Sequence, residues 1–414
     1  MKTKLIVLMP ALVGLLFGAS QLLAPTPTSS YIVQGSNLED IRSLVTEQGG
    51  TITHELGVIS AVAADLTAGQ LASIRDDSDV KRIYGNTSVE TAGKPVKDNP
   101  ASDGDESTGT DETTDMAGSG YTEFPALVEA DRLHDKGIDG WGVTIAIVDS
   151  GLYSGPGITQ DRYGKDRVTA VYDATIDYEY VEGGKGKSAI DFAELDIDDN
   201  GHGSHVAGVA SSGKLSDIGK YNGIAPAARL VAVKVFDSQG RGSYADVIRG
   251  IDWLVANRNN HDIDIINMSL SATPRSHYWD DPLNQAVMAL WDAGLVVVAS
   301  AGNTGPDPMT IGVPGNVPYV ITVGAMSDDV TPEEQHDDYL ASFSAAGPTF
   351  EGFVKPDLIA PGGHLRGVMN AKGRIAKQHP HWHDRGKYFT MSGTSQSAAV
   401  ATGVVALMLG ENPA

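Results

Sequence analysis

Short apolar runs alternate with helical patterns from residue 121 to the end of the chain, and this alternation constrains the fold most. The runs are mostly β-branched, which favours buried strands; they are Val143–Val148, Arg229–Val235, Ile263–Met268, Leu295–Ser300 and Val320–Ala325. Helices are predicted at His202–Ser211, Tyr244–Asn257, Pro282–Ala293 and Ser395–Leu409. Such alternation predicts an α/β fold of three layers, with a mostly parallel sheet covered by helices on both faces.

Four short segments lie where these runs end or these helices begin, and each contains a polar residue of interest. They are Ile145–Gly151, Asn200–Gly208, Ser300–Asn303 and Gly393–Ala398, and they contribute an aspartate, a histidine, an asparagine and a serine. A serine hydroxyl becomes nucleophilic when an imidazole takes its proton, and a carboxylate can orient that imidazole. An amide can donate to the oxyanion that forms. Together the segments carry the residue types of a hydrolytic site.

Each segment alone has a simpler interpretation. Asp149 suits a strand-ending turn, Asn303 suits a turn, and Ser395 suits a helix cap. His205 competes with His202 for the role of base, but only His202 lies between two glycines; His205 is expected to pack or hydrogen-bond within its helix. The presence of all four segments in one chain favours the active-site interpretation.

The chain order Asp, His, Ser is the order found in subtilisin. With these motifs, the chain resembles the subtilisin-like serine proteases, or subtilases, from about residue 121 onward. The resemblance implies that Ser395 is the nucleophile, His202 the general base and Asp149 the orienting carboxylate. It also implies that Asn303 and the backbone amide of Ser395 form the oxyanion hole. The expected activity is endopeptidase cleavage of proteins or peptides through an acyl-enzyme on Ser395.

The same resemblance implies a substrate-binding edge after the run Ile263–Met268. Its residues, expected to pair with peptide backbone as an added strand, are Ser269, Leu270 and Ser271. The other wall of the specificity pocket is expected to consist of Ser300, Ala301 and Gly302. The family usually has glycine where Ser271 stands, so a serine there narrows the pocket and leaves the preferred side chain open.

The N-terminus has the pattern of a secretory signal peptide. Lys2 and Lys4 precede an apolar stretch from Leu5 to Phe17, and small residues follow. We therefore expect a signal peptide over residues 1–24 and export to the extracellular space or a periplasm. An uncleaved membrane anchor is the alternative, which the Pro10 within the stretch and the lack of a basic flank after it weaken.

Residues 31–91 are predicted to form a separate small domain. The pattern indicates Tyr31–Gln34 as a strand, Asn37–Gln48 as a helix, and then strands Thr51–Glu55 and Val58–Ala63. A helix at Thr67–Asp76 and a strand at Val80–Tyr84 follow. This β-α-β-β-α-β order predicts a ferredoxin-like α+β fold. It resembles the inhibitory propeptide of subtilases, which implies an intramolecular inhibitor and an autoprocessed precursor.

An acidic, Ser/Thr/Gly-rich segment over residues 92–120 separates this domain from the rest and is predicted to be a flexible linker. The maturation cut is expected near its start, around Thr91. The peptidase domain is assigned to residues 121–414. Because it stops one helix after Ser395, where the family continues, we expect a truncated C-terminus.

Composition narrows the partners and cofactors. Acidic residues outnumber basic ones by 53 to 30, for a net charge of −23, which disfavours nucleic acid and anionic membranes. The chain has no cysteine, which excludes disulfides and thiol chemistry. No catalytic cofactor, no stable membrane association and a monomer are expected.

Two segments invite a metal interpretation. Asp196–Gly201 matches the first half of an EF-hand loop, but the twelfth position is Ala207 instead of glutamate, so the match fails. The resemblance still allows for structural calcium, with ligands that the sequence does not identify. The alternate histidines in His379–His383 are interpreted as solvent-facing residues of an insertion.

Two other functions remain open. A non-catalytic binding protein with this fold would require the loss of a catalytic position, and none of Asp149, His202 and Ser395 is lost. An esterase or transacylase would use the same three residues and differ only in its substrates.

Overall fold

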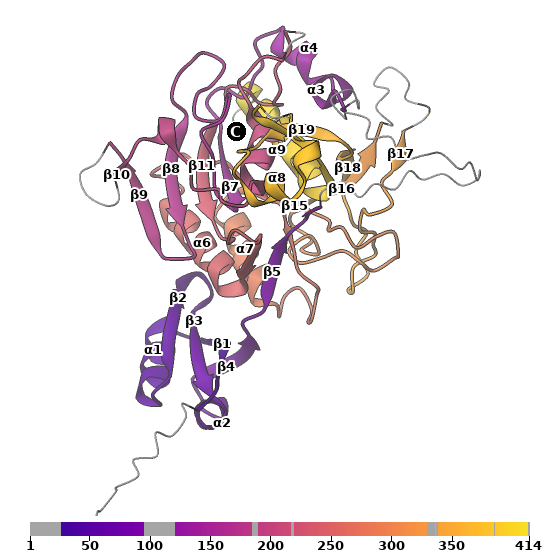
Figure 1. Cartoon of the computed structure of the whole chain (residues 1–414). Helices are drawn as coiled ribbons and strands as arrows, with labels where there is room; N and C mark the ends of the chain where they lie inside the picture. Colours follow the sequence, from indigo (N-terminus) through magenta and orange to yellow (C-terminus); the bar gives the residue numbers. More distant parts are fainter. Residues whose placement is uncertain are drawn as a thin grey trace, which may run out of the picture.

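The computed structural model describes residues 26–94, 121–183, 189–216, 219–328, 336, 338–384 and 386–412. A small N-terminal domain, indigo in Figure 1, lies below a larger α/β domain. The predicted signal peptide at 1–24 and the part of the predicted linker at 95–120 lie outside the described residues. Within the described residues, no helix is long and apolar enough to cross a bilayer.

The small domain has the predicted order of elements. They are β1 (Thr28–Gly35), α1 (Leu38–Glu47), β2 (Thr51–Leu56), η1 (Gly57–Ile59), β3 (Ala61–Thr67), α2 (Ala68–Arg75) and β4 (Val80–Gly85). The strands form an antiparallel sheet in the order β2-β3-β1-β4. Asn37 and Thr67 cap the two helices through their side chains, because the first N–H groups of a helix lack partners within it. The α+β expectation is confirmed.

One strand of this domain begins later than predicted. The backbone at Gly57–Ile59 forms a 3₁₀ turn, so β3 starts at Ala61 and not at Val58. The cause lies in the larger domain: Asp252 accepts the backbone N–H groups of Gly57 at 3.0 Å and of Val58 at 2.9 Å. Apolar periodicity does not reveal such a contact between distant segments.

The large domain is built on one mostly parallel sheet, as predicted. Its strands are β7 (Thr144–Asp149), β8 (Val168–Asp173), β9 (Tyr178–Glu182), β10 (Ala189–Ile190), β11 (Arg229–Lys234), β13 (Ile265–Met268), β15 (Val296–Ser300), β16 (Ile321–Ser327), β17 (Tyr339–Leu340) and β18 (Leu358–Pro361). The order is β10-β9-β8-β11-β7-β13-β15-β16-β17, with β18 paired to β16. Only the β8–β9 and β16–β17 pairs are antiparallel.

Helices cover both faces of this sheet (Figure 1). The helices of the large domain are α3 (Phe124–Leu127), α4 (Ala130–His134), α5 (His202–Ser211), α6 (Tyr244–Asn257), α7 (Pro282–Asp292), α8 (Arg374–Gln378) and α9 (Thr394–Glu411), with 3₁₀ turns η3 (Phe192–Glu194) and η4 (Pro380–Trp382). Helices α5 and α9 share one apolar core with the sheet, and α6 and α7 share the other. Ile32 and Leu56 of the small domain belong to the second core, so the two domains pack together.

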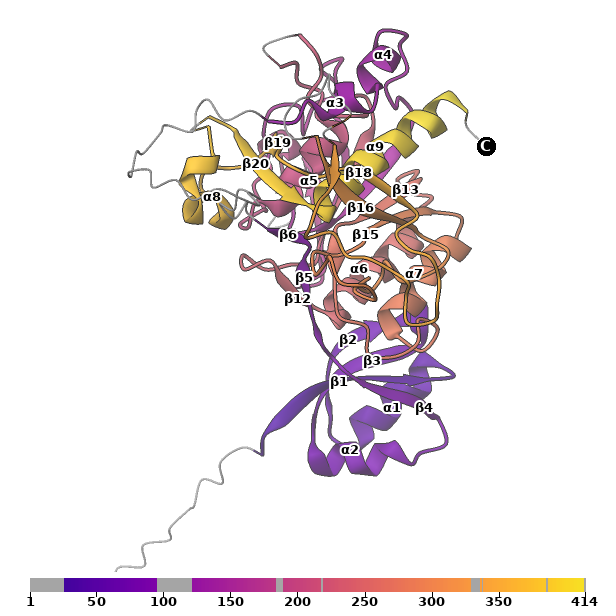
Figure 2. The same cartoon turned by 90° about the vertical axis from the view of Figure 1, so that its right-hand side faces the viewer.

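The segment that leaves the small domain runs along the large one (Figure 2). Its strands β5 (Ser88–Thr91) and β6 (Gly93–Lys94) pair with β12 (Arg241–Ser243), β14 (Leu270–Ser271) and β20 (Tyr388–Gly393), and β20 also pairs with β19 (Leu365–Val368). β5 lies between β12 and β14, antiparallel to both. The predicted linker therefore begins with paired backbone, because Gly93 and Lys94 hydrogen-bond to β20.

Candidate active site

Asp149 and His202 form a buried pair. Asp149 is the last residue of β7 and His202 the first of α5. The imidazole Nδ1 lies 2.8 Å from Oδ1 and 2.9 Å from Oδ2 of Asp149, and both side chains are fully buried. A carboxylate at Nδ1 fixes the tautomer that carries its proton there. Nε2 of His202 is buried and has no hydrogen-bond partner among the described residues, so it can accept a proton.

A carboxylate that the sequence analysis missed joins the two elements of this pair. Asp198 is buried, and its Oδ1 accepts from Ser150 Oγ and from the Gly201 N–H, each at 2.8 Å. Its Oδ2 accepts from the Ser204 N–H at 2.8 Å. Asp198 thereby ties the turn after β7 to the start of α5. In the sequence Asp198 lies in an acidic run that is typical of a solvated loop, so its structural role could not be predicted. In the described part of the chain, no group of three or more His, Cys, Asp or Glu residues could hold a metal ion.

Ser395 lies in the first turn of α9 and is fully buried. Its Oγ donates to the Ser269 carbonyl at 3.2 Å, and Ser269 Oγ donates to the Ser395 carbonyl at 3.0 Å. Ser269 follows β13, whose last residue, Met268, pairs with Val148 of β7. Asp149 and Ser269, the residue that Ser395 contacts, therefore follow paired residues at the same end of two neighbouring parallel strands. In this structure the serine hydroxyl is directed at the Ser269 carbonyl.

A second missed residue holds Ser269 in place. Asn267 donates from Nδ2 to Ser269 Oγ at 2.9 Å and accepts from Thr402 Oγ1 of α9 at 2.8 Å. This chain of bonds fixes α9 against β13, because buried polar groups need partners. The sequence did contain a signal, since Asn267 is a polar residue within the apolar run Ile263–Met268.

The side-chain oxygen of Asn303 accepts two hydrogen bonds, and its side-chain nitrogen donates one. Oδ1 accepts from the backbone N–H of Thr394 at 3.0 Å and from its Oγ1 at 2.9 Å. Nδ2 donates to the backbone carbonyl of Ala92. The turn before Asn303 requires a left-handed backbone at Gly302, where φ is 108°. The amide is thus fixed at the start of α9, facing a peptide carbonyl.

The predicted substrate edge pairs with the chain itself. Leu270 and Ser271 lie opposite Thr91 and Glu90 of β5, and Ser269 accepts the Ala92 N–H at 3.2 Å. On the other side of β5, the Thr91 N–H donates to the Gly240 carbonyl at 3.1 Å. Backbone pairing of this kind is the mode by which a peptide adds a strand to a sheet.

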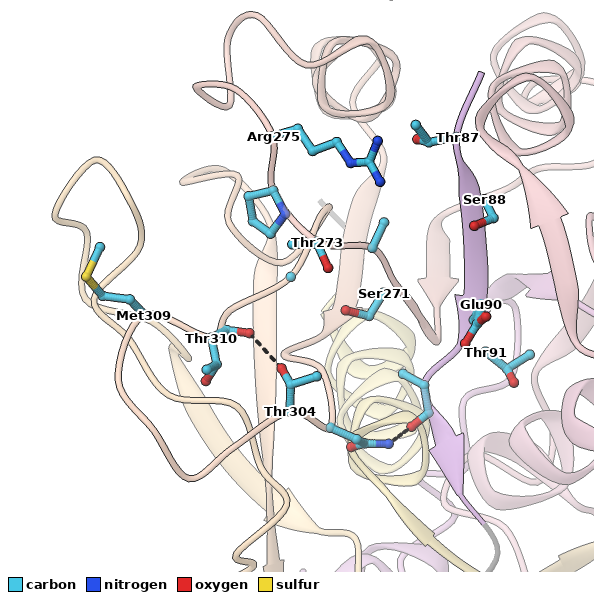
Figure 3. A pocket seen from close by; sticks show the side chains of 15 residues that line it. Thr87, Ser88, Glu90, Thr91, Ser271, Thr273, Arg275, Thr304, Met309 and Thr310 are labelled. Atoms are coloured by element: carbon cyan, nitrogen blue, oxygen red, sulfur yellow. Dashed lines mark hydrogen bonds between the residues drawn. The ribbon is translucent and has the colours of Figure 1, made fainter. Parts of the chain in front are cut away.

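The predicted second wall adjoins this edge. Ser300 Oγ donates to the Leu270 carbonyl at 3.0 Å, the Ala301 N–H to the Val323 carbonyl at 2.9 Å, and the Gly302 N–H to Thr394 Oγ1 at 3.2 Å. A cavity of about 560 Å³ lies beside β5, lined among others by Ser271 and Asn303 (Figure 3).

His205, the rival base, lies elsewhere. Its ring is fully buried, and Nε2 lies 3.1 Å from the Leu365 carbonyl and 3.0 Å from that of Phe389. The ring is packed, which is one of the two expected roles, but its hydrogen-bond partners belong to β19 and β20 and not to its own helix. Burial lowers the pKa of His205 to about 3, so the ring is neutral near pH 7. Its Nε2–H serves to anchor the β19–β20 hairpin.

Comparisons with known proteins agree with this geometry. A sequence model of the subtilase family matches residues 140–414. Serine protease AprX of Bacillus subtilis is 40% identical over 281 residues, which cover 67% of this chain and 59% of AprX. A thermostable alkaline protease of Halalkalibacterium halodurans is 28% identical over 414 residues, covering 100% of this chain and 90% of its own.

A solved structure shows the same fold. The crystal structure of fervidolysin from Fervidobacterium pennivorans, a keratinolytic enzyme related to subtilisin, matches with a TM-score of 0.66 and 22% identity. The match covers 94% of this chain and 55% of that one. The predicted three-layer fold with a mostly parallel sheet is therefore confirmed. The chain spans only 59% of AprX and 55% of fervidolysin, so it corresponds to part of each.

Proposed function

The chain belongs to the subtilase family, whose members are serine peptidases and hence hydrolases, and from this premise we propose that it is a serine endopeptidase made as a self-cleaving precursor. Its substrates are proteins or peptides. The signal pattern at residues 1–24 supports export. No cofactor takes part in the chemistry, and the enzyme acts as a monomer.

The mechanism assigns one step to each residue. Ser395 Oγ attacks the carbonyl carbon of the substrate while His202 Nε2 takes its proton, and the carbonyl oxygen becomes an oxyanion. Asn303 Nδ2 and the Ser395 N–H donate to that oxygen. His202 then gives the proton to the leaving amine, which breaks the C–N bond and leaves an ester on Ser395. Water, deprotonated by the same imidazole, hydrolyses the ester. Asp149 holds the imidazole and stabilises its positive charge.

A single contact carries the proposal: the Ala92 carbonyl accepts a hydrogen bond from Asn303 Nδ2. A carbonyl bound there, with its own N–H on Ser269, is placed as the acyl group of a substrate would be. The residues after it, Gly93 and Lys94, continue as β6 on the far side of the site. We therefore assign the self-cleaved bond to Ala92–Gly93, one residue after the Thr91 expected from the sequence.

The small domain is proposed to be the intramolecular inhibitor. β5 occupies the groove that a substrate would need. Polar contacts hold the domain on the large one: His54 Nε2 lies 3.0 Å from Asp246 Oδ1, and Arg82 lies 2.7 Å from Asp280. Asp252 of α6 also accepts two backbone N–H groups of the η1 turn. Together these contacts support a domain that stays bound after the cut.

The test uses the full chain, purified and allowed to process. We expect a new N-terminus at Gly93 and, once the small domain is released, labelling of Ser395 by a fluorophosphonate probe. Sequencing of the new N-terminus and mass spectrometry of the labelled peptide give both readings. A processed chain that neither labels at Ser395 nor hydrolyses peptides would contradict the proposal.

Asn303→Ala provides a test of the oxyanion role. We expect kcat to fall by about 10²–10³-fold with little change in KM, because the amide acts on charge that develops only in the transition state; this range is the one known for the equivalent loss in subtilisin. Steady-state kinetics on a peptide substrate measure both constants. Asn260→Ala, an exposed change of the same kind, serves as the control. Equal turnover of the Asn303 variant and the wild type would remove Asn303 from this role.

A further inference from the structure

The side chains of Ser271 and Ala92 project from the same face of the groove. Ser271 lies directly opposite Glu90 in the β5–β14 pair, and directly opposite residues of an antiparallel pair share a face. Glu90 and Ala92 are two residues apart, and side chains two apart along extended backbone also share a face. Any residue at the position of Ala92 therefore projects its side chain from the same face as Ser271.

Ser271 fills the space between the two glycines that line this part of the groove. Its Oγ lies 3.0 Å from where a Cβ on Gly302 would stand and 2.0 Å from where a Cβ on Gly312 would stand. The hydroxyl thus occupies the space that a side chain at either position would need. A side chain longer than a methyl group at position 92 would extend on the face of the groove where this hydroxyl stands.

The cavity continues beyond Ser271. Thr304, Met309 and Thr310 line it together with Ser271 and Ala92. In Figure 3 the labelled Ser271 lies between β5 and the segment that carries Met309 and Thr310. Removal of the Ser271 side chain would widen the part of this cavity that adjoins Ala92.

We propose that Ser271 restricts the enzyme to peptide bonds that follow a small side chain, above all alanine. The inference rests on the endopeptidase function proposed above and adds the side chain that the enzyme selects. The chain's own sequence agrees, since the residue held at Asn303 is Ala92. Ser271 acts by exclusion, because overpacking a filled site is unfavourable.

Two peptides copied from β5 and Ala92 test the preference directly. They are Val-Glu-Thr-Ala and Val-Glu-Thr-Phe, each joined to a fluorogenic amine. The wild-type enzyme is expected to favour the alanine peptide in kcat/KM by roughly 10- to 100-fold. Ser271→Gly should reduce that ratio at least about tenfold through faster cleavage of the phenylalanine peptide.

The ratio of Ser271→Ala should lie between those of the wild type and Ser271→Gly, and Ser271→Thr should raise the ratio above that of the wild type. Ser276→Gly, the same change outside the cavity lining, should leave it unchanged.

Self-cleavage provides a second measurement that needs no added substrate. Ala92→Phe should leave the precursor uncut at this bond, and the double variant Ala92→Phe with Ser271→Gly should restore the cut. Gel electrophoresis and N-terminal sequencing show whether each of the two variants is cut at this bond. This pair remains informative if one of the single variants of Ser271 folds poorly.

The outcomes separate the two proposals. Equal or faster wild-type cleavage of the phenylalanine peptide would overturn the selectivity, and so would an unchanged ratio in Ser271→Gly. In both cases peptides are still hydrolysed, so the endopeptidase function stands. Failure of the released, folded enzyme to cleave either peptide or to label at Ser395 would overturn that function, and the selectivity with it.

Discussion

Ser395→Ala is expected to leave the precursor intact at Ala92–Gly93 and to lower kcat on peptides by about 10⁶-fold, the size of the loss in subtilisin. Without the hydroxyl, no acyl-enzyme can form. The fold should persist, because among the described residues Ser395 Oγ donates a single hydrogen bond, to the Ser269 carbonyl. The mass of the purified chain and its circular dichroism spectrum give the two readings.

Ser397→Ala is the matched control for this variant. Ser397 lies two residues further along α9 and is also buried, but its hydroxyl donates within the helix start, to the Gly393 carbonyl at 3.5 Å. The control should process normally. Processing of Ser395→Ala at the wild-type rate, with no other protease present, would contradict self-cleavage by this residue.

Asp149→Asn is expected to lower kcat by about 10⁴-fold while the fold is retained. The asparagine amide would donate to His202 Nδ1, which forces the ring proton onto Nε2. That nitrogen could then no longer take the proton of Ser395. Steady-state kinetics on a peptide substrate and a thermal melt give the comparison.

Asp135→Asn removes the same charge at an exposed position, where the carboxylate lies 3.7 Å from Lys220 Nζ. Its activity should match that of the wild type. If Asp149→Asn kept more than a tenth of the wild-type kcat, the orienting carboxylate would have to be another residue, and Asp198 would be the first to examine.

The sequence predicted the framework of the site because its signals are local. The helix that begins at His202 and the strand that ends at Asp149 follow from the spacing of apolar residues and from the residues that bound them. Those boundaries in turn place the polar residues at one edge of the sheet.

What the sequence could not predict depends on contacts between distant segments. The pairing of Gly93 and Lys94 with β20 uses backbone groups, which every residue has, so composition suggested a linker instead. The turn at Gly57 is set by Asp252 of the other domain. The bonds of Asp198 to both elements of the Asp149–His202 pair likewise appear only once the chain is folded.

In the proposed precursor, the packing of the small domain on α6 and α7 would determine how activity begins. Once the proposed cut at Ala92–Gly93 is made, no covalent bond would hold that domain, and its release would become an ordinary dissociation governed by affinity and concentration. Dilution into a large volume would favour free enzyme, and a confined space would favour the inhibited complex. The onset of proteolysis would then report how far the protein has spread from its source.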